Sequence, residues 1–197
     1  MKVFDISDYQ DEKRVETLVE KGAEGVLIKL GEMINGEHFR DTLAYHFVTE
    51  ADMYNIPFGL YYVSDAISPD GFMCEAQRIN NELYQMLGTR FPELGLWWDM
   101  EKPRVCRPGV WPQLRDIIGT QEAWYPAHKG KIGIYAQYSY FYDYIDFDEL
   151  VYYGIPVWVA QYYHENSLKT EHPELNHVAW QFTTHGETQD ENVWYGF

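Results

Sequence analysis

The stretch GLWWDMEK, residues 95–102, places two carboxylates two positions apart behind a pair of tryptophans. Its apolar start is typical of a buried β-strand. On an extended strand, Asp99 and Glu101 point to one face, while Trp98 and Met100 point to the other. Two carboxylates about 6–7 Å apart, the spacing that two strand residues give, repel each other wherever water is excluded. We therefore expect this strand to end at a functional site.

Length and charge limit the kinds of protein this can be. The chain has 197 residues, with no linker-like or low-complexity tract, so we expect one domain over residues 1–197. Its formal net charge is −16. A nucleic-acid partner requires clustered Lys and Arg, which this sequence lacks, so the charge argues against nucleic acid. A neutral or locally apolar ligand fits the composition better.

Cysteines, histidines and apolar runs exclude several further classes. Cys74 and Cys106 are too few for a disulfide framework and form no C-x-x-C pair, so we expect free thiols. His172 and His177 are five residues apart, which fits no standard zinc helix. We expect no metal and no cofactor. Met1 leads almost directly into the apolar KVFDI without an export signal, and no apolar run is long enough to cross a membrane.

Aromatic residues are abundant: 17 Tyr, 10 Phe and 7 Trp make up 17% of the chain. Most are expected in the core or half-buried at its edge. The rest exceed what one core is expected to absorb, and we expect them to line a groove. Flat rings with polar tips can stack on sugar faces and still form hydrogen bonds at their edges.

The pattern along the chain predicts alternating strands and helices. Helical spacing of apolar residues occurs over 11–22, 40–54, 70–88 and 110–124, and 138–150 could hold a further helix. The later strands follow one another with little room for helices. Five βα units followed by three strands predict a parallel barrel, in which chemistry gathers at the carboxyl ends of the strands. The expected strands are 2–6, 25–30, 57–63, 94–99, 131–136, 155–163, 177–183 and 191–196.

Four carboxylates fall at strand ends in this arrangement. Asp5 ends the first strand, Asp99 and Glu101 end the fourth, and Asp190 comes just before the last. Asp5 and Asp190 could each be an ordinary turn or cap residue. Because all four would meet at one rim of a barrel, we interpret them as a functional cluster.

The successive strand segments resemble those of glycoside hydrolase family 25, the Ch-type lysozymes or N-acetylmuramidases. A single D-x-E triplet is common, but here eight motifs occur in the order of the family between residues 3 and 196. They are FDISDYQ (4–10), VLIKLGE (26–32), IPFGLYYVS (56–64), LWWDME (96–101), IGIYAQYSYF (132–141), IPVWVAQY (155–162), AWQFT (179–183) and DENVWYG (190–196).

The resemblance implies an α/β fold, a single flattened TIM-like (β/α)5β3 barrel, and hydrolysis of the β-1,4 bond after N-acetylmuramic acid in peptidoglycan. It also implies that Glu101 is the general acid and that Asp99, Asp5 and Asp190 complete the catalytic set. Glycoside cleavage needs one protonated carboxyl beside ionised ones. We expect these neighbours to raise the pKa of Glu101 by like-charge repulsion. The family further implies retention of configuration, with the substrate's 2-acetamido group as internal nucleophile.

Strand positions around the carboxylates are expected to bind substrate, although alternation directs some of them away from the groove. Lys29, a charge within an apolar strand, either pairs with an acid at the rim or extends to solvent. Tyr62 departs from the family, whose Tyr-His-Phe stretch reads YYV here, so no role can be carried over from that histidine. The predicted substrate-binding residues are Tyr61, Tyr135, Trp158, Gln161, Trp180 and Gln181.

Two alternatives remain open. One is a chitinase-like barrel of family 18, in which the catalytic acid is also the last residue of a D-x-E motif. LGLWWDME, however, lacks the preceding aspartate of the longer motif of that family. The other is a catalytically inactive barrel that only binds glycan, against which the presence of all four acids argues. We expect a monomeric enzyme whose partner is the peptidoglycan glycan strand, with no nucleic-acid or membrane partner. It would act outside the cell, or be released from the cytoplasm as a phage-type lysin.

Overall fold

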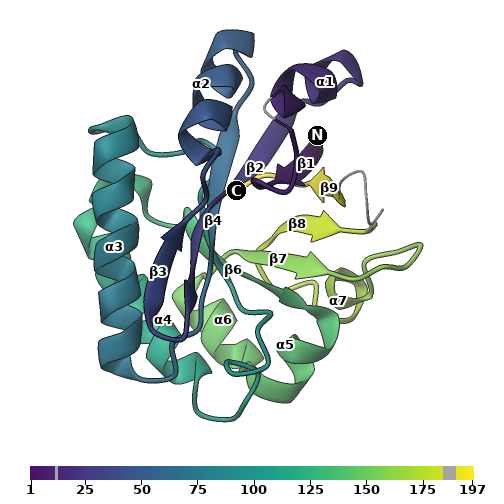
Figure 1. Ribbon diagram of the computed structural model, residues 1–197. Coiled ribbons are helices and arrows are strands. Elements are labelled where there is room, and N and C mark those ends of the chain that lie inside the picture. The colour runs from purple at the N-terminus through teal and green to yellow at the C-terminus, as the bar shows by residue number, and fades with distance from the viewer. Residues whose placement is uncertain (12, 184–189) are drawn as a thin grey trace.

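The computed structural model describes residues 1–11, 13–183 and 190–197, which form a ring of strands with helices packed against part of its outer side (Figure 1). The strands are β1 (Lys2–Ile6), β2 (Gly25–Ile34), β3 (Glu37–Arg40), β4 (Phe58–Val63), β5 (Leu96–Asp99), β6 (Ile132–Gln137), β7 (Val157–Ala160), β8 (His177–Gln181) and β9 (Asp190–Trp194). Eight of them close the ring in the order β1, β2, β4, β5, β6, β7, β8, β9 and back to β1. All neighbours in the ring are parallel except β9, which is antiparallel to both β8 and β1. The predicted eight-strand barrel is therefore confirmed, but the expectation that all of its strands are parallel is corrected at β9.

Helices follow each of the first five barrel strands along the chain and cover part of the outside of the ring (Figure 1). They are α1 (Arg14–Glu20), α2 (Ala44–Tyr54), α3 (Pro69–Leu87), α4 (Trp111–Trp124), α5 (Tyr138–Tyr144), α6 (Phe147–Tyr153) and α7 (Ser167–Glu171). The start of α3 shows how the sequence sets a boundary, because Ser68 Oγ accepts a hydrogen bond from the Gly71 N–H at 3.2 Å and Pro69 opens the first turn. The five-residue α7, between β7 and β8, was not expected from the sequence.

The hairpin of β2 and β3 is a second difference from the prediction. Ile34 pairs with Glu37, so Asn35 and Gly36 form a two-residue turn, with φ of 52° and 84°. Asn-Gly is typical of such turns because both positions need positive φ. The signal was present in the sequence, but the predicted strand ended at residue 30. β3 pairs with β2 outside the ring and extends the sheet at the carboxyl end of β2.

The lower half of the barrel interior is filled by aromatic rings. The Trp97 ring centroid lies 5.9 Å from that of Trp158 and 6.0 Å from that of Trp194. Its indole N–H donates to the Leu94 carbonyl at 2.7 Å. A Cβ on Gly133 would lie 2.5 Å from Cζ3 of Trp97, so this position in β6 must be glycine. Because Trp97 is fully buried among these rings, truncating it to alanine should cost roughly 3–5 kcal/mol of stability.

A larger apolar layer lies between the strands and the helices. It contains Trp98 and Met100, as alternation along residues 95–102 predicts. The Trp98 indole N–H donates to Gln121 Oε1 on α4 at 2.7 Å, which attaches β5 to its covering helix. Since the outward side chains hold the helices, the inward side chains of the same strands are free to form a site.

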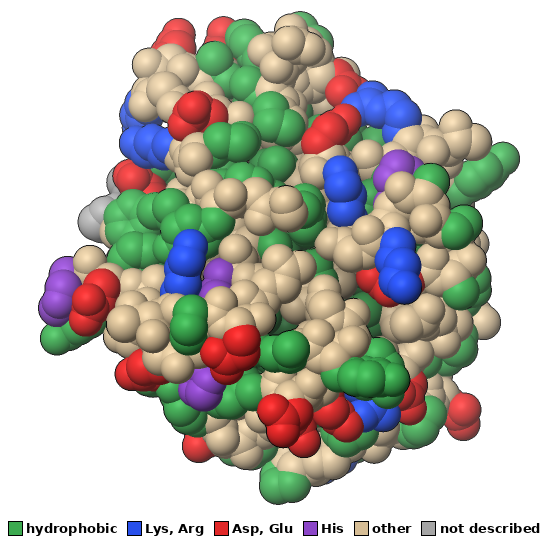
Figure 2. Space-filling view, turned by 180° about the vertical axis from the view of Figure 1, so that it is seen from behind, with side chains coloured by type: hydrophobic (Ala, Val, Ile, Leu, Met, Phe, Trp, Pro, Cys, Tyr) green, Lys and Arg blue, Asp and Glu red, His purple; other side chains and the backbone are tan. Residues whose placement is uncertain are grey.

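The surface carries the acidic excess. Figure 2 shows one face, on which Lys and Arg side chains occur singly or in small groups among Asp and Glu side chains. In the described part of the chain, no helix combines the length and the apolar character needed to cross a membrane.

Candidate active site

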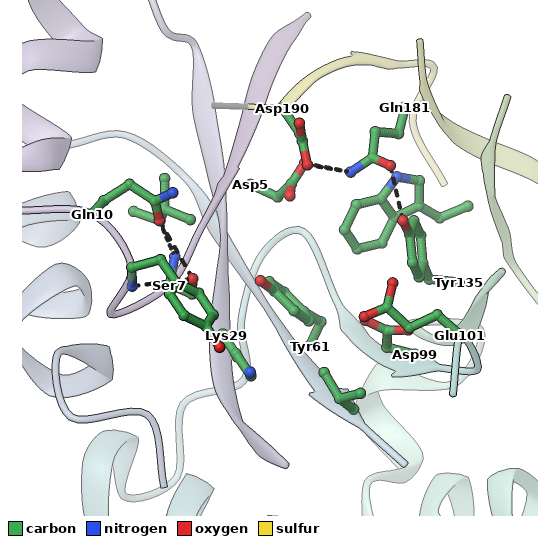
Figure 3. Close-up of a pocket in the computed structure, with 14 residues that line it drawn as sticks. Asp5, Ser7, Gln10, Lys29, Tyr61, Asp99, Glu101, Tyr135, Gln181 and Asp190 are labelled. Carbon is green, nitrogen blue, oxygen red and sulfur yellow. Dashed lines mark hydrogen bonds between the residues drawn. The ribbon is translucent and has the colours of Figure 1, made fainter. Parts of the chain in front are cut away.

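On each of four parallel strands, an apolar inward-facing residue is followed two positions later by a polar one. Because side chains alternate, both members of each pair face the interior. The pairs are Val3 and Asp5 on β1, Leu27 and Lys29 on β2, Trp97 and Asp99 on β5, and Ala179 and Gln181 on β8. The polar members line a cavity of about 290 Å³ at the carboxyl ends of the strands, above the aromatic layer (Figure 3).

All four predicted carboxylates line this cavity. Asp5 and Asp190 lie opposite each other in the antiparallel pairing of β1 and β9. Asp99 ends β5, with Glu101 two residues beyond, and Figure 3 shows this second pair across the cavity from the first. Within the described part of the chain, no group of three or more His, Cys, Asp or Glu side chains has the arrangement of a metal site. The structure thus brings together residues that lie up to 185 positions apart in the sequence.

Two amide side chains hold Asp5. Gln181 Nε2 donates to Asp5 Oδ2 at 3.0 Å and lies 3.5 Å from Asp190 Oδ2. Asn192 Nδ2 donates to the same Asp5 oxygen at 2.7 Å. Asp5, on β1, is therefore held in position by side chains from β8 and β9.

Hydrogen bonds to the amide oxygens of Gln181 and Asn192 set the orientation of both side chains. Tyr135 and Tyr162 hydroxyls donate to Gln181 Oε1 at 2.8 and 3.1 Å, and the Trp158 indole N–H donates to Asn192 Oδ1 at 2.8 Å. The indole can only donate and an ionised carboxylate can only accept, so the NH2 group of each amide faces the carboxylates and its oxygen faces the tyrosine and tryptophan side chains. Trp158 and Tyr135 are therefore supports for the acid cluster.

The pKa of Asp5 is raised to about 7, chiefly by burial and also by the nearby Asp190. The hydrogen bonds from Asn192 and Gln181 oppose this rise because they stabilise the ionised form. Asp5 can therefore change its charge close to neutral pH.

Asp99 is the most enclosed carboxyl of the cluster, with 3% of its surface exposed. Burial raises its pKa well above the ordinary value, Glu101 adds to the rise, and Lys29 opposes it. It accepts a hydrogen bond from the backbone of Glu101, but its Oδ1 has no partner among the described residues. A ligand that enters the cavity with an N–H or O–H group would meet an acceptor that the protein leaves unfilled.

Glu101 is an exposed residue on the cavity wall. Desolvation by the surrounding protein atoms raises its pKa, while Lys29 and Lys102 lower it, and Glu32 and Asp190 raise it. The rise agrees with the expectation from the sequence, but its cause differs. Desolvation contributes most, and the like charges on which the prediction depended contribute less.

A bridge of three charged side chains runs along the cavity. Lys29 Nζ donates to Glu32 Oε1 at 2.7 Å, and Lys102 Nζ donates to Glu32 Oε2 at 2.9 Å. Lys102 also donates to the Met33 carbonyl. Of the two alternatives for Lys29, the pairing with an acid is therefore the one observed, and the bridge attaches β2 to the segment that carries Glu101.

The six predicted substrate-binding residues divide into two groups. Tyr61, Tyr135, Trp158 and Gln181 line the cavity, whereas Gln161 and Trp180 do not. Gln161 Oε1 accepts from the Ser167 backbone N–H at 2.8 Å, and its carbonyl accepts from the Trp180 indole at 2.8 Å. The placement of these two side chains in the groove is therefore corrected: they hold the connection between β7 and α7.

Some residues of the site were not found from the sequence. Asn192 is the most important, because it contacts both Asp5 and Trp158. Its signal was the alternation of DENVW, which puts it on the same face as Asp190. Tyr9, in the loop after β1, lines the cavity and is 84% exposed, but loop positions show no such periodicity.

Comparisons with known proteins agree with this geometry. The model of the family described as "Glycosyl hydrolases family 25" matches residues 4–191. The structure is similar to the spore cortex lytic enzyme SleM of Clostridium perfringens, with a TM-score of 0.76 and 19% identity, covering 98% of this chain and 66% of that one. It is also similar to the catalytic domain of endolysin ply40 from bacteriophage P40 of Listeria monocytogenes, with a TM-score of 0.74 and 20% identity over 98% of this chain and 92% of that one.

A third similar structure is a family 25 glycosyl hydrolase from Bacillus anthracis, with a TM-score of 0.70 and 20% identity over 100% of this chain and 89% of that one. Among proteins of curated function, none matches this sequence. At these low sequence identities, similarity to the solved structures supports the fold alone. The family model, in contrast, matches the amino-acid sequence itself. Because that model spans residues 4–191, the chain belongs to glycosyl hydrolase family 25, as the strand motifs predicted.

Proposed function

We propose that the protein is a peptidoglycan hydrolase that cleaves the β-1,4 bond between N-acetylmuramic acid and N-acetylglucosamine. One observation carries the proposal: carboxyls from β1, β5 and β9 meet in one cavity, where Glu101 is open to solvent and has a raised pKa. A raised pKa favours the protonated form of the carboxyl, which a general acid requires. Membership of the family, and the lytic enzyme and endolysin among the similar structures, support the same assignment.

In the proposed first step, protonated Glu101 donates its proton to the glycosidic oxygen, and the leaving sugar departs with it. The oxygen of the substrate's 2-acetamido group bonds to the anomeric carbon as the glycosidic bond breaks. Oδ1 of Asp99, which has no partner among the described residues, would accept the acetamido N–H and so orient this group. In the second step Glu101 takes a proton from water, whose oxygen bonds to the same carbon and releases the acetamido oxygen.

Asp5 and Asp190 have a different part in the proposal. They lie across the cavity from Asp99 and Glu101, and in their ionised form they would stabilise positive charge that develops on the sugar ring. The amides of Gln181 and Asn192 keep Asp5 in place before substrate arrives, so little reorganisation is needed during the reaction.

The exposed rings suggest where the glycan lies. Trp158 and Tyr135 are 1% and 5% exposed, so they support the site from beneath. Tyr9 lines the cavity with 84% of its surface exposed, and Tyr162, whose hydroxyl reaches Gln181, is 49% exposed. We assign stacking on sugar faces to these two rings. The proposed partner is thus the glycan strand of the bacterial wall, bound by a monomeric enzyme.

Mass spectrometry of the sugars released from purified peptidoglycan tests the proposal. Fragments with reducing-end muramic acid are expected. Reducing-end glucosamine would instead identify a glucosaminidase, and cleavage of chitin oligosaccharides in place of peptidoglycan would favour a chitinase-like enzyme. Binding to walls without any release of fragments would show an inactive glycan-binding barrel.

A further inference from the structure

A second cavity, of about 250 Å³, opens on the same side of the barrel as the catalytic one. Its walls come from segments that follow the carboxyl ends of three strands: the β2–β3 turn, the connection from β4 into α3, and the segment after β5 (Figure 1). The lining residues used below are Met33, Asp65, Ala66, Ile67, Cys74 and Arg104. We call this space the side cavity.

The side cavity and the catalytic cavity are neighbours. Lys29 lines the catalytic cavity and Met33 lines the side cavity. The bridge from Lys29 through Glu32 to Lys102 runs from one to the other, and ends on the Met33 carbonyl. Arg104, on the wall of the side cavity, is three residues beyond Glu101. A substituent on a sugar held at Glu101 therefore needs to cross only this bridge to enter the side cavity.

The lining of the side cavity is partly apolar and also includes the carboxyls of Asp65 and Glu75 and the guanidinium of Arg104. Met33, Ala66 and Ile67 supply apolar surface. Arg104 Nη1 lies 3.1 Å from Asp65 Oδ2, and the Arg104 side chain is 49% exposed, so its remaining N–H groups can reach a ligand. Such a lining suits a short peptide with small aliphatic side chains that carries a carboxylate for Arg104 and a positively charged group for Asp65.

We propose that the side cavity binds the first residues of the peptide that substitutes muramic acid, so that the enzyme prefers peptide-bearing glycan to peptide-free glycan. The inference rests on the proposed function, because it concerns the same substrate. In that polymer the muramic acid beside the cleaved bond carries a peptide with free carboxylates. A peptide on the sugar at Glu101 must leave the catalytic cavity on one side, and the side cavity offers complementary chemistry there.

Cys74 provides a direct test, because it lines the side cavity and is exposed. Alkylation with a bulky maleimide would fill the side cavity without changing a residue of the catalytic one. We expect kcat/KM on soluble peptide-bearing glycan strands to fall at least tenfold and kcat/KM on peptide-free strands to change less than twofold. Cys74→Ser, treated identically, is the matched control for reaction at the half-buried Cys106.

Arg104→Met tests the same inference without a bulky group. Loss of a charge-assisted hydrogen bond to a peptide carboxylate should lower kcat/KM on peptide-bearing strands about tenfold. On peptide-free strands, kcat/KM of the variant should equal that of the unmodified enzyme. Arg90→Met is the control, because Arg90 pairs with Asp52 and lies before β5, at the opposite end of the barrel.

The outcomes separate this inference from the proposed function. Equal losses on both substrates, or no loss on either, would overturn the role of the side cavity while leaving the hydrolase assignment in place. An unmodified enzyme without preference for peptide-bearing strands would overturn it as well. If the unmodified enzyme cleaved neither substrate, the proposed function would fail, and this inference with it.

Discussion

The two carboxyl pairs of the catalytic cavity are held in different ways. Asp5, beside Asp190, accepts hydrogen bonds from two amides whose orientation is itself fixed by buried donors. Asp99 has an oxygen without a partner among the described residues, and Glu101 has only lysines nearby to oppose its raised pKa. The first pair is thus positioned by the protein, whereas the second is left for the substrate to complete.

The energetic difference follows from burial. A buried carboxylate that accepts two hydrogen bonds keeps much of the stabilisation that water would give, while an unfilled acceptor costs roughly 1–3 kcal/mol. Protonation removes most of that cost, and the pKa of Asp99 is accordingly raised well above its ordinary value. A site that tolerates such a cost when empty recovers it when a ligand donor arrives.

The largest expected effect comes from Glu101→Gln. The amide keeps the shape of the side chain but cannot donate the proton, so clearing of wall suspensions should fall by a factor on the order of 10²–10⁴. The melting temperature should stay close to that of the unmodified protein, since Glu101 is exposed. Turnover near the unmodified level would show that the second pair does not contain the acid.

Asn192→Leu should break the first pair. It removes one donor from Asp5 and leaves the buried indole N–H of Trp158 without its acceptor, so stability should fall by roughly 2–4 kcal/mol. Urea unfolding at pH 7 measures the loss. Tyr84→Leu, at an exposed position on α3, is the control and should change stability by less than about 0.5 kcal/mol. An equally small loss for Asn192→Leu would mean that the amides do not hold Asp5.

Lys29→Met should change the second pair through charge. Lys29 lowers the pKa of Asp99 and of Glu101, so its removal should raise both. A general acid with a higher pKa stays protonated to higher pH, and the alkaline limb of the pH profile of kcat/KM should move to higher pH. Lys131→Met, before β6 at the far end of the barrel, should leave that limb in place. A limb that moved to lower pH would contradict the assignment of Glu101 as the acid.

A further effect concerns how stability changes with pH. The pKa of Asp5 is about 7 in the folded protein, above its ordinary value of 3.8, so the folded state binds the proton more tightly. Its contribution to stability is then complete below about pH 4 and is lost as the pH rises through 7. Asp5→Asn should lose less stability than the unmodified protein between pH 4 and pH 8. Parallel curves in a series of thermal melts would show that Asp5 does not titrate in this range.

Much of the fold and part of the site could be predicted because both depend on local periodicity. The alternation in LWWDME placed Asp99 and Glu101 inside and Trp98 outside, as observed. The order of strands and helices followed from where the spacing of apolar residues changes between the strand pattern and the helix pattern. Gln161 could not be placed in the same way, because β7 ends at Ala160 and alternation no longer applies beyond it.

The partner of Lys29 shows a second limit. In a regular strand, residues three positions apart point to opposite faces, so Lys29 and Glu32 should not meet. The pairing of β2 with β4 shifts register between Lys29 and Gly31, and this irregularity brings Glu32 to the side of Lys29. A bulge depends on the neighbouring strand as well as on local sequence. Sequence periodicity could therefore identify Lys29 as unusual without identifying its partner.

The position of β9 also affects when the enzyme can first become active. Asp5 precedes Asp190 and Asn192, which complete its surroundings, by some 185 residues along the chain, so it is synthesised well before them. Because β9 lies between β8 and β1, the ring cannot close until this strand has left the ribosome. A nascent or truncated chain without β9 has Asp99 and Glu101 but lacks one carboxylate and one amide of the site. The complete acid cluster can therefore form only once synthesis has passed residue 194.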